Sequence, residues 1–134
     1  MRKIIYLITA ILLTTVAVSC NSDNTPTAVA DKSVKCLQKG DYEAYSKLMY
    51  YDDTLSSNEL KTQQETTAAL LKGKYEESVK DKGKITGYRM LSEEVADSNA
   101  VVKMRIGYEK ADSADESISL RLNHDGKWRL TLSK

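Results

Sequence analysis

The sequence predicts an α+β domain in which three amino-terminal helices pack on a four-stranded antiparallel meander sheet. Two observations lead to this prediction. Up to about residue 80, apolar residues recur at helical spacing between recognisable helix caps. From residue 85 onward, apolar and polar residues alternate, which is typical of strands with one buried face. Because 134 residues leave room for one domain after a leader segment, both halves are expected to share one core.

The three helices are predicted from their caps and apolar stripes. The first begins at Pro26 or Thr27, and Gly40 ends it. Asp41 is a suitable N-cap for the second helix. Ser56, with a Glu three residues later, forms a capping box that opens the third. The predicted helices cover about residues 28–39, 42–50 and 57–80.

The four strands are predicted from strict alternation. In the second strand Val102, Met104 and Ile106 share one face. Asp125-Gly126, between the last two strands, is a strong hairpin signal. An antiparallel sheet with one apolar face must bury that face, and the helices are available to cover it, which gives a roll. The predicted strands are residues 85–91, 100–108, 117–123 and 127–133, with reversals at 97–99 and 109–116.

The charge balance excludes one class of partner. Lys and Arg total 20 and Asp and Glu total 19, and both signs are interspersed along the chain. Nucleic-acid binding needs a strong positive excess, so no nucleic acid is expected as a partner. Phe is absent and Tyr occurs eight times, so Tyr is expected to replace Phe in the core and at its edge.

Residues 1–19 are typical of a secretory signal peptide. The positive start Met1-Arg2-Lys3 precedes an uncharged apolar run at 4–18. This run of 15 residues is shorter than the about 20 that a membrane-spanning helix needs. The sequence therefore predicts export rather than a transmembrane anchor.

The end of this run resembles the lipobox of bacterial lipoproteins. A small residue, Ser19, directly precedes Cys20, although Ala17 stands where Leu is usual. The resemblance implies that the Cys20 thiol takes a diacylglyceryl group and that the amine freed by cleavage is acylated. Two or more acyl chains make a stable anchor, so membrane lipid becomes a partner. The alternative is a plain secreted protein in which Cys20 is incidental.

The resemblance also implies a location at the bacterial cell envelope. Polar residues 20–27 would tether a single domain at 28–134 close to its membrane. Asn21 is not the Asp that, in bacterial sorting, marks retention at the inner membrane. The outer membrane is therefore favoured.

The order and spacing of the elements resemble the nuclear transport factor 2-like, cystatin-like superfamily, and within it small bacterial lipoproteins of unknown function. The stretches that carry the resemblance are LQKGDYEAYSKLM (37–49), KGKITGYRMLSEE (82–94), AVVKMRIGYE (100–109) and NHDGKWRL (123–130). The resemblance implies a curved sheet and helices around a cone-shaped pocket. Different members use that pocket as an isomerase or dehydratase site, as a ligand-binding cavity, or only as a core.

The expected inner wall of this pocket lacks the acid or base that catalysis would need. Enzymatic members require an Asp or Glu there, whose pKa desolvation would raise. Here Tyr108 is the one ionisable group expected on the wall. No catalytic residue is therefore predicted, although a small isomerase or dehydratase using Tyr108 or an acid from the outer face stays as the alternative. The expected wall comprises Ala100, Val102, Met104, Ile106, Tyr108, Ile118, Leu120, Leu122, Trp128, Leu130 and Leu132.

The remaining polar residues give no cofactor or metal site. His124 lies in a predicted turn, and no second His exists to complete a common metal site. Cys36 lies on the apolar stripe of the first helix and is expected to be a buried small hydrophobe. The acidic groups lack the spacing of a Ca²⁺ loop and are expected in solvated turns. They are Asp52-Asp53, Asp112-Asp115-Glu116 and Glu93-Glu94-Asp97.

The leading hypothesis is a non-catalytic, lipid-anchored envelope protein that binds a small ligand or another envelope protein. A third possibility is an inhibitor or immunity-type protein, for which an exposed Tyr50-Tyr51 patch would be the expected sign. The residues predicted to line a pocket or meet a partner are Tyr50, Tyr51, Tyr88, Met104, Tyr108 and Trp128.

Overall fold

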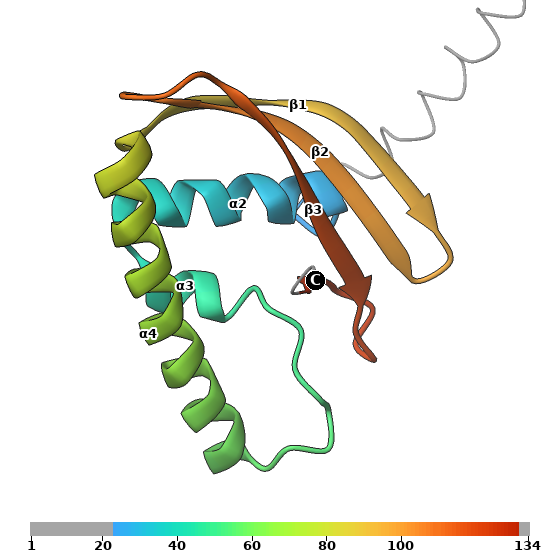
Figure 1. Ribbon diagram of the computed structural model, residues 1–134. Helices are drawn as coiled ribbons and strands as arrows, with labels where there is room; N and C mark the ends of the chain where they lie inside the picture. The colour runs from blue at the N-terminus through green and yellow to red at the C-terminus, as the bar shows by residue number, and fades with distance from the viewer. Residues whose placement is uncertain (1–22, 132–134) are drawn as a thin grey trace, which may run out of the picture.

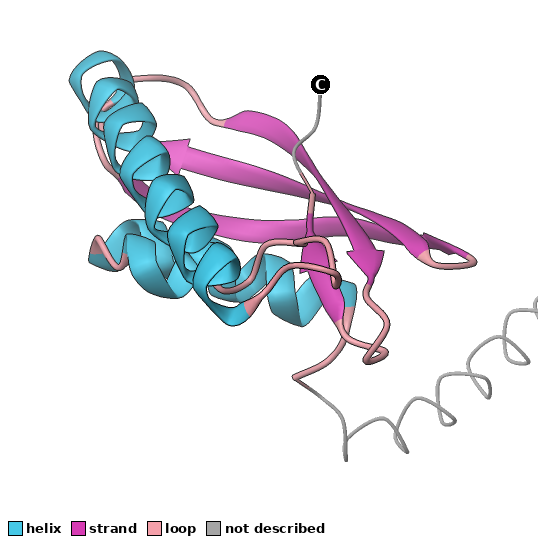
Figure 2. Ribbon diagram, turned by 90° about the horizontal axis from the view of Figure 1, so that it is seen from below, coloured by secondary structure: helices cyan, strands magenta, loops and turns pink. Residues whose placement is uncertain are grey.

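A computed structural model of the chain describes residues 23–131 and shows an α+β roll (Figure 1). The strands pair antiparallel in the order β1-β2-β3-β4, and the described helices lie on one face of the sheet (Figures 1 and 2). The predicted fold class is confirmed. Cys20 and the predicted signal peptide lie outside the described residues. The elements are α2 (Pro26–Lys39), α3 (Tyr42–Ser46), α4 (Ser57–Lys82), β1 (Ile85–Ala96), β2 (Asn99–Tyr108), β3 (Ala114–Leu122) and β4 (Trp128–Leu130).

Helix α2 is fixed at both ends by its sequence. Pro26 occupies the first helical position, and the Thr25 hydroxyl accepts a hydrogen bond of 3.1 Å from the Ala28 amide. Gly40 ends the helix in the left-handed conformation, at φ 74°. At the amino end, Glu93 Oε1 from β1 also accepts hydrogen bonds from the amide and hydroxyl of Thr27, at 2.9 and 2.6 Å. Glu93 was predicted to lie in a turn, but β1 continues past it, so its carboxylate caps α2.

The core lies between α2 and the inner face of the sheet. Met104 and Val102 of β2 are completely buried, and Leu120 and Leu130 are 2% exposed. They meet the buried stripe of α2, which consists of Pro26, Val29, Ala30, Ser33 and Val34. Cys36, which was predicted to be buried on that stripe, is only half-buried, because the buried stripe ends at Val34.

The second helix is shorter than predicted, since α3 ends at Ser46 instead of continuing to Tyr50. The chain then becomes extended and pairs in parallel with β4, through a bridge between Met49 and Leu130. The Tyr50 amide donates to the Leu130 carbonyl at 2.7 Å, and the Leu130 amide donates to the Leu48 carbonyl at 2.8 Å. This pairing covers the edge of β4 and supplies hydrogen bonds that a continued helix would not.

The sheet also departs from its predicted limits. β1 continues to Ala96, with register irregularities on the way, so the first reversal is a tight turn around Asp97 at φ 56°. β3 begins at Ala114, three residues earlier than predicted. β4 covers only Trp128–Leu130, and the predicted inner position Leu132 lies outside the described residues.

Helix α4 differs from α2, because none of its 26 residues, all of which the structure describes, is buried. Its start is defined by the predicted capping box, in which the Ser56 hydroxyl and the Glu59 carboxylate each accept a backbone hydrogen bond of the other residue, at 3.2 and 2.9 Å. From its carboxyl end near the sheet, α4 extends away from the strands alongside α3 (Figure 1). No described helix is long and apolar enough to cross a membrane.

Candidate functional site

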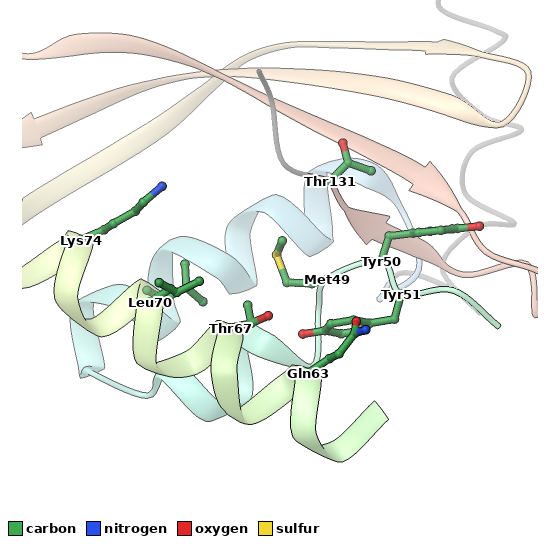
Figure 3. A pocket seen from close by; sticks show the side chains of 9 residues that line it. Met49, Tyr50, Tyr51, Gln63, Thr67, Leu70, Lys74 and Thr131 are labelled. Atoms are coloured by element: carbon green, nitrogen blue, oxygen red, sulfur yellow. The ribbon is translucent and has the colours of Figure 1, made fainter. Parts of the chain in front are cut away.

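A pocket of about 420 Å³ lies between α4, the extended segment after α3 and the end of β4 (Figure 3). Its α4 wall is formed by side chains at successive turns of one helix face. Its opposite wall is the segment that pairs with β4, together with the residue that follows that strand. The lining residues are Met49, Tyr50, Tyr51, Gln63, Thr67, Leu70, Leu71, Lys74 and Thr131.

The pocket is mainly apolar. Met49 lines the pocket and is 7% exposed, so this residue belongs to both the pocket wall and the hydrophobic core. Leu70 is 61% exposed although it is a large aliphatic residue, because nothing in the described chain covers it. Lys74 is the only lining residue, among those described, that carries a full charge at neutral pH. In the view of Figure 3 the Lys74 side chain extends from α4 toward the strands.

Tyr50 and Tyr51 lie at the pocket with different orientations (Figure 3). The Tyr51 phenol points toward α4 and donates a 2.7 Å hydrogen bond to the Ser46 carbonyl. Burial raises the pKa of Tyr51, and a hydrogen bond with Thr67 offsets part of the increase. The Tyr50 ring points away from Tyr51 and lies under the Arg121 guanidinium, 4.9 Å from the ring centroid. The pair was predicted as an exposed patch, but both side chains are half-buried.

A second cavity, of about 320 Å³, lies where the carboxyl end of α4 approaches the sheet. Tyr45, Tyr75 and Tyr108 line it together with Glu116 and Lys82. Burial raises the pKa of Tyr108, and the nearby Glu116 carboxylate raises it further. The Lys82 ammonium lies 5.2 Å from the centroid of the Tyr108 ring. This cavity is more polar than the first.

Glu116 overturns the prediction that Tyr108 is the one ionisable group on the inner wall. The predicted strand began at residue 117, which left Glu116 in a loop. In the structure Glu116 lies opposite Met104 in the sheet register, and therefore on the inner face. The alternation of β3 contained this information, since Glu116 is two residues before Ile118, but the start of the strand had to be known first.

The residues predicted to form one pocket or surface are separated in the structure. Tyr50 and Tyr51 line the first pocket and Tyr108 the second. Met104 is completely buried and Trp128 is 9% exposed, so both belong to the core. Tyr88 contacts α2 instead of either cavity wall.

Tyr88 forms a polar cluster with two residues of α2. Its phenol donates a 2.7 Å hydrogen bond to Asp31 Oδ1, and the Lys35 ammonium lies 2.9 Å from Asp31 Oδ2. Burial, followed by the hydrogen bond and the charge of Asp31, raises the pKa of Tyr88 to about 12. Burial alone would raise the pKa of Asp31, but the hydrogen bonds from Lys35 and Tyr88 lower it overall. The cluster joins α2 to β1.

His124 and the acidic turns make local contacts. His124 Nδ1 lies 3.5 Å from Asp53 Oδ2, which joins the β3–β4 turn to the segment after α3. Asp52 Oδ1 accepts hydrogen bonds from the amide and hydroxyl of Thr54, at 2.9 and 2.8 Å, and thereby closes a turn. In the described part of the chain no cluster of three or more metal-binding side chains occurs.

Sequence reasoning missed the α4 wall of the first pocket. Gln63, Thr67, Leu70 and Lys74 recur at helical spacing, which was the available signal. Their mixture of polar, apolar and charged types does not distinguish a pocket wall from a solvated helix face. On the opposite wall, Met49 and Tyr50 come from a segment that was predicted to be helical.

Comparison with known proteins gives one family and one fold. Residues 18–131 match the family described as Domain of unknown function (DUF4878). No curated protein matches the sequence. A crystal structure from Campylobacter jejuni, provisionally described as an NTF2-like transpeptidase, superposes with a TM-score of 0.63 and 15% identity. The alignment covers 81% of this chain and 99% of that chain. This similarity shows an NTF2-like fold.

Proposed function

Since the chain belongs to the DUF4878 family, whose function is unknown, and has an NTF2-like fold, we propose that it is a lipid-anchored envelope protein that binds a small, largely apolar ligand without converting it. The observation that carries the proposal is the pocket under α4. Its described lining is mainly apolar and contributes no carboxylate and no imidazole, the groups most often used for proton transfer.

The size and lining of the pocket suit a ligand. Its volume of about 420 Å³ lies within the range of small-molecule sites, about 300–1,000 Å³. Met49, Leu70 and Leu71 offer apolar contact, while Gln63 and Thr67 offer hydrogen bonds that would orient a ligand. Occupation would remove the exposed part of Leu70 from water, which favours binding.

A fluorescent probe with an apolar body and one negative charge, 1-anilinonaphthalene-8-sulfonate, tests this site. We expect the folded protein to bind the probe and Leu70→Gln to weaken binding about fivefold, because part of the apolar wall is lost. Ala69→Gln is the matched control, since Ala69 is exposed on α4 and does not line the pocket. Equal affinity of the two variants would contradict the proposed site, and circular dichroism would verify that both are folded.

The lipid anchor rests on the segment before the described residues. The small residue before Cys20, at the end of a short apolar run, supports acylation. We expect Cys20→Ser to block processing and to release the protein from membranes. Membrane fractionation and electrophoretic mobility measure both effects. If fractionation and mobility did not change, the proposed acylation of Cys20 would be wrong. The proposal about the pocket would not be affected.

A second candidate function, an isomerase or dehydratase, is favoured by one observation. Glu116 and Tyr108 line the second cavity together, which places a carboxylate beside a phenol that stays protonated at neutral pH. Such a pair could accept and donate protons on one substrate. The test is deuterium exchange from heavy water at the α-carbon of a cyclic ketone. A catalysed rate that Glu116→Gln abolishes would support this candidate, and no catalysed rate would oppose it.

At 15% identity the similarity to the Campylobacter jejuni structure shows the fold alone, so the transpeptidase activity in its description is not proposed for this chain. Cys36 in particular is not suited to act as a thiol nucleophile. A thiol nucleophile needs a lowered pKa, whereas burial and then the nearby Asp41 carboxylate raise the pKa of Cys36. The single His of the sequence, His124, contacts Asp53 and Asp125, far along the chain from Cys36 and in another part of the fold.

A further inference from the structure

The described helices lie on one face of the sheet and leave its outer face uncovered (Figure 1). Two arginine pairs lie directly opposite each other in neighbouring strands, Arg89 with Arg105 and Arg121 with Arg129. Like charges in this position destabilise a sheet. The second pair has partners within the fold, since Arg121 lies over the Tyr50 ring and Arg129 donates a 3.3 Å hydrogen bond to the Lys47 carbonyl. For Arg89 with Arg105, an anionic ligand would offset the repulsion.

One of the two pairs borders a shallow depression of about 270 Å³. Gly87 of β1 lies opposite Gly107 of β2, so two positions next to the arginines carry no side chain. A Cβ built on Gly87 would meet nothing within 4 Å, which shows that the space above it is open. The depression is lined by Gly87, Tyr88, Arg89, Arg105, Gly107 and Ser113.

Hydroxyl groups complete the rim of this depression. A Cβ on Gly107 would lie 3.1 Å from Thr86 Oγ1 and 3.7 Å from Ser113 Oγ. The space above Gly107 is therefore bordered by two hydroxyls as well as by the two guanidinium groups. Hydroxyl and guanidinium donors together suit an oxyanion with several acceptor atoms.

The positive charge at the depression is only partly balanced. Asp115 accepts from Arg105 at 2.8 and 3.3 Å, through Nε and Nη2. The hydrogen bond from Arg105 lowers the pKa of Asp115, and the charges of Lys103 and Arg89 lower it further, so all three cations act on one carboxylate. Arg89 and Lys103 form no ion pair with any other described residue, which leaves the cluster with a net positive charge.

We propose that the depression between Arg89 and Arg105, above Gly87 and Gly107, is a binding site for a phosphate group. Guanidinium groups match phosphate oxygens in geometry and charge. Because glycine has no side chain, the phosphate can approach the strands at Gly87 and Gly107. There the hydroxyls of Thr86 and Ser113 can donate hydrogen bonds to it. Because the depression is shallow and open to solvent, the phosphate can belong to a lipid headgroup or to a free phosphate ester.

Two probes distinguish these sources, with the full chain held in a non-ionic detergent. The first probe is glycerol 3-phosphate, and isothermal titration calorimetry measures its binding. The second probe is phosphatidylglycerol added to the detergent micelles, with phosphatidylcholine as the comparison. Chemical-shift changes at residues of β1 and β2 report its binding. Binding of the first probe assigns a free phosphate ester, and a response to phosphatidylglycerol alone assigns a lipid headgroup. No response to either probe would overturn the proposal.

Three variants test the location of the site. Gly87→Val fills the depression without changing charge, and Val is favoured in strands. Arg89→Gln removes one guanidinium. We expect each to weaken binding about tenfold, as the loss of a charge-assisted contact would. Arg121→Gln is the matched control, because it removes the same charge from the same face outside the depression, and should change affinity less than about twofold. An equal loss in Arg121→Gln, or full binding by Gly87→Val, would overturn the assigned site.

Discussion

Helices α2 and α4 show how two helices of one small domain can serve different purposes. α2 has 14 residues, five of them buried against the sheet, and both ends are fixed by caps. α4 has 26 residues and none is buried. The longer helix therefore adds little to the core and instead forms one wall of a pocket. In this fold the helix that packs on the core and the helix that lines the pocket are different ones.

The contrast is also seen in the composition of the two helix faces. A helix that packs on the sheet must show a continuous apolar stripe, as α2 does. The pocket face of α4 instead mixes Leu70 and Leu71 with Gln63, Thr67 and Lys74. Such a mixture suits a surface that contacts solvent when empty and a ligand when filled.

The largest effect on the free energy of unfolding is expected at Trp128, in the core between α2 and the sheet. It is 9% exposed, and its amide donates a 3.0 Å hydrogen bond to Asn24 Oδ1 before α2. Trp128→Ala should lower the free energy of unfolding by about 3–5 kcal/mol, since it leaves a cavity in the core. Chemical denaturation measures the change. A change near zero would show that Trp128 does not stabilise the core. It would then contradict the contrast between the stabilising core at α2 and the pocket face of α4.

A smaller effect is expected at the polar contact between α2 and β1. Asp31→Asn should cost about 1.5–3 kcal/mol at neutral pH, because two hydrogen bonds to a charged acceptor are weakened. The pKa of Asp31 is lowered in the folded state, so its contribution is present above the ordinary value of 3.8 and disappears as pH falls through the folded value. The difference in stability between wild type and variant should therefore close on acidification.

The same variant has a second measurable result, at the phenol of Tyr88. The pKa of Tyr88, about 12 in the native protein, should fall toward its ordinary value of 10.0 once the Asp31 charge is absent. Ultraviolet titration of the phenols follows this change. Tyr88→Phe is the matched control for stability and should cost less, because the ion pair of Asp31 with Lys35 is retained. A pH-independent stability difference would contradict the assignment.

The smallest effect on stability is expected on α4. Leu70→Gln should change the free energy of unfolding by less than about 0.5 kcal/mol, because Leu70 is 61% exposed and Leu and Gln have similar helix propensities. Thermal or chemical denaturation checks this directly. A loss comparable with that of Trp128→Ala would show that α4 is part of the core, and the contrast between the two helices would then fail.

Local signals in the sequence predicted the beginnings of the helices well. Asp41 and Ser56 cap their helices as predicted, because capping depends on groups within one turn of the chain. The first helix begins at Pro26, one of the two predicted starts, and its N-cap, Thr25, was not predicted. The end of α3 was predicted wrongly, since Met49 pairs with Leu130 from the opposite end of the domain. No local pattern contains that contact.

The candidate site was predicted only in part. Tyr50 and Tyr51 were identified as surface residues and do line a pocket. Lys74 and Leu70 were missed because the mixed residue types of this helix face do not distinguish a pocket wall from a solvated surface, and Glu116 was missed because the start of β3 was placed too late. Glycine and arginine positions on the outer face became informative only when strand pairing placed Gly87 opposite Gly107 and Arg89 opposite Arg105.

The fold class follows from local features of the sequence, because helix caps, the alternation of the strands and the Asp125-Gly126 turn act over a few residues. The sequence also predicted which side chains of β2 face inward, since a strand has a fixed period of two. Which surfaces meet is not contained in such local patterns. Strand register and the distance of α4 from the sheet depend on contacts between residues far apart in the chain, and those contacts create both the pocket and the arginine-lined depression.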